Sequence, residues 1–225
     1  MISDIFVIMD IAKFRKRAFM HRNKIEINGK ANYFGLKLDE DSDYKTCDLL
    51  QLNKKNIHCL DEIYKKIEHT YTKSKFKNEI LEFLQKTLIN INNYNFNKIC
   101  FDQLKYICKK LSIQTEIILE SNFLTKDEIK NLGASKRLLH HAQYTNSQVY
   151  ITGINSADYL DVEIFKKNNI YHLVQKFNYD IFRNLQKCED PLSIVHQIAH
   201  LGFEGLGNLM REKQVNKEKI LASLN

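Results

Sequence analysis

SDIFVIMD, at Ser3–Asp10, is the stretch of sequence from which the fold can be worked out. Five consecutive apolar residues, Ile5–Met9, lead to the carboxylate of Asp10. A short apolar run that ends in a polar residue is typical of a buried parallel strand. In open α/β sheets, ligands bind in the crevice outside the carboxyl ends of such strands. We therefore expect an α/β sheet with Asp10 at its functional edge.

The composition excludes several classes of protein. Of the 225 residues, 44% are hydrophobic and 27% are charged, as in ordinary globular proteins. The sequence contains neither an apolar run long enough to cross a membrane nor the charged and apolar pattern of a signal peptide. The five cysteines are odd in number and form no CxxC pair, which favours reduced thiols over disulfides or a zinc site. We expect a cytoplasmic protein without a membrane span.

The net charge of +7 would suit an anionic partner. However, Lys, Asn and Ile are frequent throughout the chain, and no basic helix with interleaved aromatic residues stands out. Nucleic-acid-binding domains usually show such a localised pattern. We therefore predict no nucleic-acid partner.

Apolar periodicities predict strands that alternate with helices. Three stripes with a spacing of three to four residues predict helices in a helical subregion at about residues 54–112. The short apolar runs that follow predict strands at Thr115–Leu119, Val149–Thr152 and Ile170–Val174. Alternating strands and helices imply right-handed crossovers. We predict one domain over residues 1–225 with an α/β fold, in which a mostly parallel Rossmann-like sheet has a helical segment inserted or packed alongside.

Turn and cap residues mark the ends of several elements. Asn28-Gly29 suits a turn with positive φ before a strand at Ala31–Leu38, and the acidic residues 39–53 predict a surface segment. Thr125–Glu128 resembles a capping box. The later helices are predicted at Lys136–Tyr144, at Ser156–Lys167, and from an N-cap at Asp190 to Gly202.

Two groups of residues are candidates for ligand binding. Basic residues follow Asp10 in the connection behind it, at Lys13, Arg15, Arg17, Arg22 and Lys24. Such side chains at a sheet edge suit phosphate or carboxylate groups, although a solvated basic loop explains them equally well. In the second group, Gly153 ends a strand and polar side chains follow up to Asp161, which would expose backbone N–H groups to an anion. An ordinary N-capped helix explains that segment at least as well.

Two histidines lie on one face of the final helix. His196 and His200 have the spacing of a zinc hydrolase motif, but the glutamate that would act as its general base is absent and no third ligand is evident. We do not predict a metal site.

Taken together, these segments resemble the WbqC-like family. The resemblance is carried by SDIFVIMD, by RNKI at Arg22–Ile25, by the helical region with Tyr71 and Phe76, and by Leu111–Ser121, Lys136–Asp161 and Pro191–Gly202. Family members are associated with bacterial surface-polysaccharide loci, notably those for O-antigens with amino-acylated sugars. The resemblance implies a transferase that moves glycine or another acyl group onto the amine of a nucleotide-linked amino sugar.

The resemblance also implies roles for individual residues. Asp10 matches the first position of an acidic pair, with Ile11 at the second, and would orient the sugar or its amine as the catalytic residue. In the last helix, His196 stands where the family usually has aspartate. The substrate or phosphate contacts carried over are Arg22, Asn23, Lys24, Ser121, Thr152 (in place of serine), Gly153, Tyr159 and Asp161.

Family members begin with a strand and an HQPxYxP-like turn before the SD strand. That turn is similar to the one found in nucleotidyltransferases, so ATP would activate the carboxylate and the sugar amine would attack the acyl-adenylate. The sequence given starts after that segment. The alternative is therefore an N-terminally truncated, non-catalytic binding or scaffold relative of the same pathway. The oligomeric state stays open.

Overall fold

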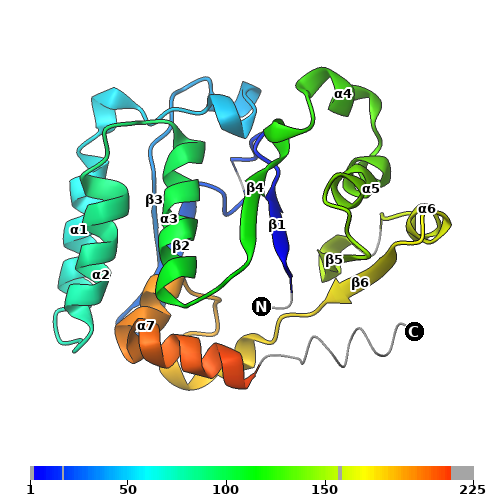
Figure 1. Ribbon diagram of the computed structural model, residues 1–225. Coiled ribbons are helices and arrows are strands. Elements are labelled where there is room, and N and C mark those ends of the chain that lie inside the picture. Colours follow the sequence, from blue (N-terminus) through cyan, green and yellow to red (C-terminus); the bar gives the residue numbers. More distant parts are fainter. Residues whose placement is uncertain (1–2, 17, 157–158, 214–225) are drawn as a thin grey trace. The chain divides into compact units, whose positions relative to one another are not determined.

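The computed structural model describes residues 3–16, 18–156 and 159–213 (Figure 1). This part of the chain divides into two compact units. The first unit combines residues 3–11 with residues 115–178, and the second combines residues 12–114 with residues 179–213. The fold is mixed α/β, as predicted. That both units act as one functional domain stays a prediction.

Two parallel strand pairs form the centre of the first unit. β1 (Ile5–Ile8) pairs with β4 (Glu116–Leu119), and β5 (Val149–Gly153) pairs with β6 (Tyr171–Gln175). Both pairs are parallel, as the apolar runs predicted, although the strands described here form two-stranded sheets and not one continuous sheet. Apolar side chains of α5, α6 and their flanking segments form the core beside β5 and β6, from Leu138, Ala142, Leu160, Phe165 and Ile170.

Three helices belong to the first unit. They are α4 (Lys126–Asn131), α5 (Ala134–Tyr144) and α6 (Val162–Lys167). The predicted capping box is confirmed, because the Thr125 side chain accepts from the Glu128 N–H while the Glu128 carboxylate accepts from the Thr125 N–H. The helix predicted at Ser156–Lys167 is shorter than expected. Asp161 caps its first turn through the Glu163 N–H, and Ser156 lies in a separate 3-10 turn, while residues 157–158 of the predicted helix lie outside the described residues.

The second unit is mainly helical, as predicted for residues 54–112. Among its helices are α1 (Cys59–Thr70), α2 (Lys77–Leu84) and α3 (Phe96–Lys110), labelled in Figure 1. Apolar side chains of all three contribute to one core. α2 continues into a π-helical turn at Gln85–Ile89. The short 3-10 turns of both units are Ser42–Tyr44, Cys47–Leu49, Lys54–Asn56, Glu120–Asn122, Ile154–Ser156 and Tyr179–Leu185.

Two sequence-based expectations in the second unit are wrong. The basic connection after Asp10 contains a strand, β2 (Arg22–Ile27), which pairs antiparallel with β3 (Lys30–Gly35) through the predicted Asn28-Gly29 turn. Its charged residues alternate with isoleucines that face the core, and this period of two is the strand signal. Residues 39–53 are not simply a surface segment, because Leu50 and Leu52 are buried.

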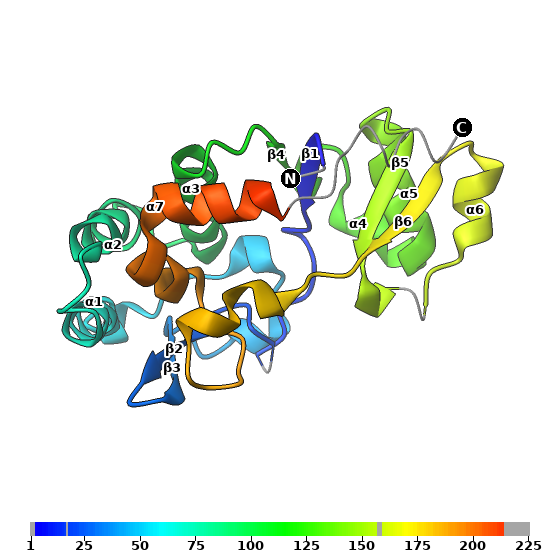
Figure 2. The ribbon, with the colours of Figure 1, turned by 90° about the horizontal axis from the view of Figure 1, so that it is seen from below.

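The last helix, α7 (Ile194–Glu212), differs at both ends from the prediction. Ser193 is its N-cap, while the carboxylate of Asp190 instead pairs with Lys24. Gly202, predicted to lie just past the end of the helix, instead interrupts it with φ 66° and ψ 174°, and helical residues continue beyond it. Figure 2 shows the resulting bend in α7. The buried side chains of Phe203 and Leu206 explain why a second helical segment forms there.

None of the helices described by the structure combines the length and the apolar character that a membrane crossing requires.

Candidate functional site

Asp10 lies at the carboxyl end of β1, where the sequence predicted a functional edge. Its side chain is only 2% exposed. Oδ1 accepts a hydrogen bond of 3.0 Å from the backbone N–H of Ser121, which follows β4. The parallel pairing of β1 and β4 thus brings two of the predicted site residues together. The carboxylate is held in a fixed position at this edge of the strand pair.

Directly before Ser121, a charge cluster that sequence reasoning missed supports this edge. Glu120 is fully buried. Its Oε1 accepts from Nε of Arg137 at 2.5 Å and from Nε2 of His141 at 2.7 Å, while Nη2 of Arg137 donates to Oε2. Arg137 and His141 are one turn apart on the same face of α5. The bidentate contact fixes the backbone that presents the Ser121 N–H to Asp10.

The charge of Glu120 follows from these contacts. Burial alone would raise the pKa of Glu120, but the hydrogen bonds from Arg137 and His141 and their positive charge outweigh it. The pKa therefore lies below its ordinary value, and Glu120 is ionised at neutral pH. A signal for this cluster was present in the sequence, because a charged residue follows an apolar strand and an Arg and a His are spaced four apart on the next long helix.

At the end of β5, Thr152 and Gly153 have different surroundings. The Thr152 side chain is buried, and its hydroxyl lies 2.8 Å from Nε2 of His172 in β6. Burial lowers the pKa of His172. Gly153 is exposed, and a Cβ added there would meet no atom within 4 Å. The hydroxyl of Thr152 is therefore engaged within the sheet, whereas the surface at Gly153 is open.

Tyr159 and Asp161 serve local contacts near α6. The Tyr159 ring is 57% exposed, and its hydroxyl donates to Oγ of Ser156 at 3.2 Å. The Asp161 carboxylate caps α6, and its backbone N–H donates to Oγ of Ser135. The Asp161 carboxylate therefore accepts from the Glu163 N–H, a backbone group at the start of the helix where the sequence predicted that an anion would bind.

In the second unit, the predicted phosphate-binding residues lie on β2. Arg22 and Lys24 share one face of the strand, and Asn23 is exposed and accepts from the Lys24 N–H at 2.9 Å. Nζ of Lys24 donates to Oδ1 of Asp190 at 2.5 Å, and this hydrogen bond raises the pKa of Lys24. The two cations therefore point in one direction and have an acidic neighbour.

Three other basic residues were predicted in the same connection. The backbone of Lys13 bridges to Thr46, and the N–H of Arg15 donates to the sulfur of Met20. Arg17 lies outside the described residues.

His196 in α7 uses both of its ring nitrogens in the core of the second unit. Nε2 donates to the carbonyl oxygen of Leu185 at 2.9 Å, and Nδ1 accepts from the hydroxyl of Tyr71 at 3.1 Å. The ring of His200 lies 4.5 Å away between centroids. Among the residues that the structure describes, no group of three His, Cys, Asp or Glu side chains could hold a metal ion. The contacts of His196 are those of a neutral imidazole that joins three segments.

We expect the free energy of unfolding to fall as the pH drops below about 6.5, the ordinary pKa of histidine. Burial lowers the pKa of His196 in the folded chain, so the unfolded chain takes up a proton first. The contribution of His196 to the free energy of unfolding is therefore fully present above that pH. Below it the contribution decreases, by at most about 1.4 kcal/mol per pH unit for one proton. Urea denaturation at several pH values from about 7.5 to about 5.5 measures this slope.

The variant His196→Gln should show a shallower pH slope than the unmodified chain. His69→Gln is the matched control, because His69 is exposed in the same unit. An unchanged slope in His196→Gln would contradict the assignment of the titration to this residue.

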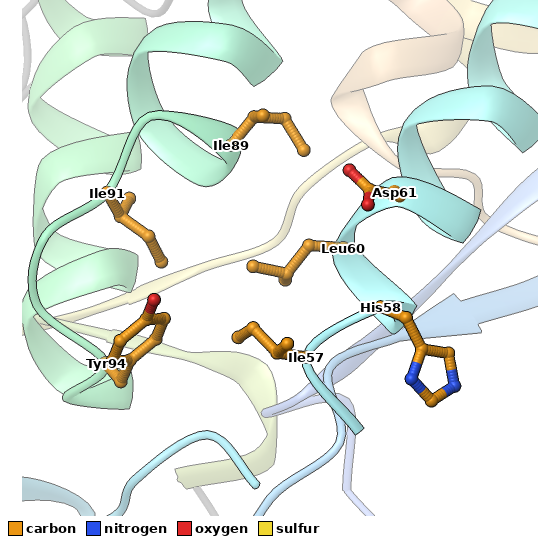
Figure 3. Close-up of a pocket in the computed structure, with 7 residues that line it drawn as sticks. All are labelled: Ile57, His58, Leu60, Asp61, Ile89, Ile91 and Tyr94. Carbon is orange, nitrogen blue, oxygen red and sulfur yellow. The ribbon is translucent and has the colours of Figure 1, made fainter. Parts of the chain in front are cut away.

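A pocket of about 230 Å³ lies elsewhere in the second unit (Figure 3). Its walls come from the start of α1 with the two residues before it and from the end of the π-helical turn with the segment that follows, and the carboxylate of Asp61 lies at one end. In Figure 3 the ring of His58 points away from the space between the apolar side chains. The pocket is lined by Ile57, His58, Leu60, Asp61, Ile89, Ile91 and Tyr94. None of the predicted site residues lines it.

Comparison with known proteins gives one match. A family model described as the WbqC-like protein family matches residues 1–206, and these residues include segments of both units. No curated protein and no solved structure matches the chain.

Proposed function

The chain belongs to the WbqC-like protein family, and on this premise we propose that it transfers glycine or another acyl group to the amine of a nucleotide-linked amino sugar. The reaction would serve the synthesis of a bacterial surface polysaccharide such as an O-antigen. It would take place in the cytoplasm, where ATP is available and the five free cysteines stay reduced.

The observation that carries the proposal is the fixed carboxylate of Asp10 at the carboxyl edge of β1 and β4. Asp10 is almost completely buried, and a hydrogen bond to a carboxylate is stronger in such surroundings than in water. A carboxylate is an acceptor only, so its natural partners are the N–H groups of an amine or the hydroxyl of a sugar. The contact with Ser121 uses Oδ1, and in the proposed complex Oδ2 would accept from the sugar amine.

The proposed chemistry is an ordinary acyl transfer. ATP and the free acid would form an acyl-adenylate and pyrophosphate. The neutral sugar amine would then attack the acyl carbon, so that a C–N bond forms, the bond to AMP breaks, and the amine loses one proton. Asp10 would orient the amine and accept that proton as general base. The Glu120–Arg137–His141 cluster would act only through the backbone, by keeping Ser121 in place.

Other residues are proposed to bind anionic groups. On β2 of the second unit, Arg22 and Lys24 would contact phosphates, with Asn23 beside them. Ser121 and the backbone at Gly153 are proposed contacts for a second anion. Thr152, Tyr159 and Asp161 would shape that region, because the first is bonded to His172 and the last caps α6.

We expect the unmodified protein, incubated with ATP, glycine and a dTDP-linked amino sugar, to produce the glycylated sugar, detected by mass spectrometry. Asp10→Asn should lower the rate by about 100-fold or more, the range for loss of a general base. Asp127→Asn is the matched control, because Asp127 is an exposed carboxylate of the same unit that pairs with Lys130. Its rate should not change.

Three outcomes separate the alternatives. Full activity in Asp10→Asn would rule out Asp10 as the catalytic residue. Absence of product with the unmodified protein would overturn the enzyme proposal. If the nucleotide sugar then still raised the melting temperature, the non-catalytic binding relative would be the correct interpretation, since a ligand that binds the folded state stabilises it.

A further inference from the structure

Two aromatic rings surround the cations of β2 at the surface of the second unit. Tyr33 in β3 lies directly opposite Lys24, and Phe19 precedes β2 in the chain. The two rings are stacked with their centroids 6.0 Å apart and their planes 25° apart. We call Phe19, Arg22, Lys24 and Tyr33 the hairpin cluster.

Each cation of the hairpin cluster is close to both rings. Cζ of Arg22 lies 4.9 Å from the centroid of Tyr33 and 5.8 Å from that of Phe19. Nζ of Lys24 lies 5.0 Å and 5.4 Å from the same centroids. All four distances are within the range of cation–π attraction. The rings therefore hold two like charges beside each other that would otherwise repel.

Burial of apolar surface does not explain this arrangement. Phe19 is 56% exposed and Tyr33 is 49% exposed. Two large rings that stay at the surface around a pair of cations restrict the rotamers of both long side chains. That restriction costs conformational entropy in the free protein, and the same entropy then need not be lost when an anion binds.

Asp190 is the one acidic group that the structure shows bonded to Lys24. Its carboxylate is 46% exposed, whereas the Lys24 side chain is 13% exposed. In the absence of a ligand this contact holds Nζ in place, and it also competes with any incoming anion for the same donor. Two adjacent cations with a displaceable anionic partner suit a ligand that carries two linked negative groups.

We propose that Phe19 and Tyr33 are positioning residues that hold Arg22 and Lys24 as a binding site for the diphosphate of a nucleoside diphosphate, with Asp190 as a competing anion. This inference rests on the proposed function, in which these cations contact the substrate phosphates. It adds the two rings and Asp190, which sequence reasoning did not find. The shared ligand chemistry is the diphosphate group, whether free or linked to a nucleoside.

The test measures binding of inorganic pyrophosphate and of dTDP to the full chain by calorimetry. Tyr33→Leu should weaken both by about fivefold to tenfold, the effect of about 1 kcal/mol of lost cation–π attraction. Tyr33→Phe keeps the ring and removes only the hydroxyl that contacts Lys24, so it should bind both ligands more tightly than Tyr33→Leu does. Asp190→Asn should instead strengthen binding, because Lys24 loses its competing partner. Tyr44→Leu is the control, since Tyr44 is exposed in the same unit.

Each result decides the inference without an activity assay. The inference is supported if Tyr33→Leu weakens the binding of both ligands and Asp190→Asn strengthens it. Loss of dTDP binding without loss of pyrophosphate binding in Tyr33→Leu would mean that the ring stacks on the base, which overturns it. Equal losses of affinity in Tyr33→Phe and Tyr33→Leu would also overturn the inference. The absence of binding to the unmodified chain would overturn it as well. If pyrophosphate binds as expected but no sugar is acylated, the proposed function fails and the diphosphate site stands.

Discussion

Glu120→Gln is expected to lower the free energy of unfolding by about 3–5 kcal/mol, the usual cost of breaking a buried ion pair by removing one partner. The amide that replaces the carboxylate would turn an N–H₂ group towards donors of Arg137 or His141, because both of them now donate to Glu120. The Arg137 charge would lose its partner in a site with little access to water. Urea denaturation followed by circular dichroism measures the change.

Glu116→Gln is the matched control for this prediction. Glu116 lies at the start of the same strand, β4, and is exposed, so its replacement should change stability by no more than about 0.5 kcal/mol. A second test is the pair Glu120→Gln and Arg137→Gln. If the two residues act as one unit, the double variant should lose clearly less stability than the sum of the single losses. Additive losses, or a loss below about 1 kcal/mol in Glu120→Gln, would contradict the cluster.

Gly202→Ala is expected to destabilise the protein by about 2–4 kcal/mol, since strain and overpacking each cost about 1–3 kcal/mol. With φ 66° and ψ 174°, Gly202 lies in a backbone region that is essentially restricted to glycine. A Cβ there would approach ring carbons of Phe76 to 2.6 Å and Oε1 of Glu79 to 3.1 Å. The Glu79 carboxylate also accepts from the Phe203 N–H at the bend, so relaxation would disturb this hydrogen bond as well.

Gly205→Ala, three residues further along α7, separates this effect from helix propensity. Gly205 has ordinary helical geometry, and its new Cβ would lie 3.4 Å from Cβ of Leu201, a tight contact at most. Alanine is favoured over glycine in a helix by up to about 1 kcal/mol, so this variant should be neutral or stabilising. Equal losses in Gly202→Ala and Gly205→Ala would show that the bend has no special requirement for glycine. The measurement is the same urea denaturation at neutral pH.

The sequence allowed the position of Asp10 to be predicted because local pattern alone determines it. An apolar run that ends in a carboxylate describes both the strand and its edge, and the structure places Asp10 at that edge. The partner of Asp10 was harder to predict, since Ser121 is 111 positions away. For the Glu120 cluster, the sequence pattern indicates the members but not their contact. The spacing of Arg137 and His141 shows that they share a helix face, but nothing local shows which carboxylate they meet.

The strand β2 was missed for a different physical reason. Its charged residues favour a loop as much as a binding edge when they are considered one by one, although a strand with one buried face needs only every second residue to be apolar. Ile25 is completely buried, whereas its neighbours Lys24 and Glu26, on the other face of the strand, are only partly buried. The hairpin cluster depends on this register, because it places Tyr33 opposite Lys24. Without the strand, the two rings have no assigned position beside the cations.

The parallel pairing of β1 with β4 has a consequence for the order of folding. The intervening residues 12–114 belong to the second unit, so β1 is synthesised long before its partner. Closing so long a loop costs entropy that grows only with the logarithm of its length, but contacts between distant residues slow folding. Folding of the second-unit residues between them would replace the long flexible loop by an ordered segment. On the ribosome, the residue that we propose as the catalytic base therefore acquires its hydrogen-bond partner only after more than half of the chain has emerged.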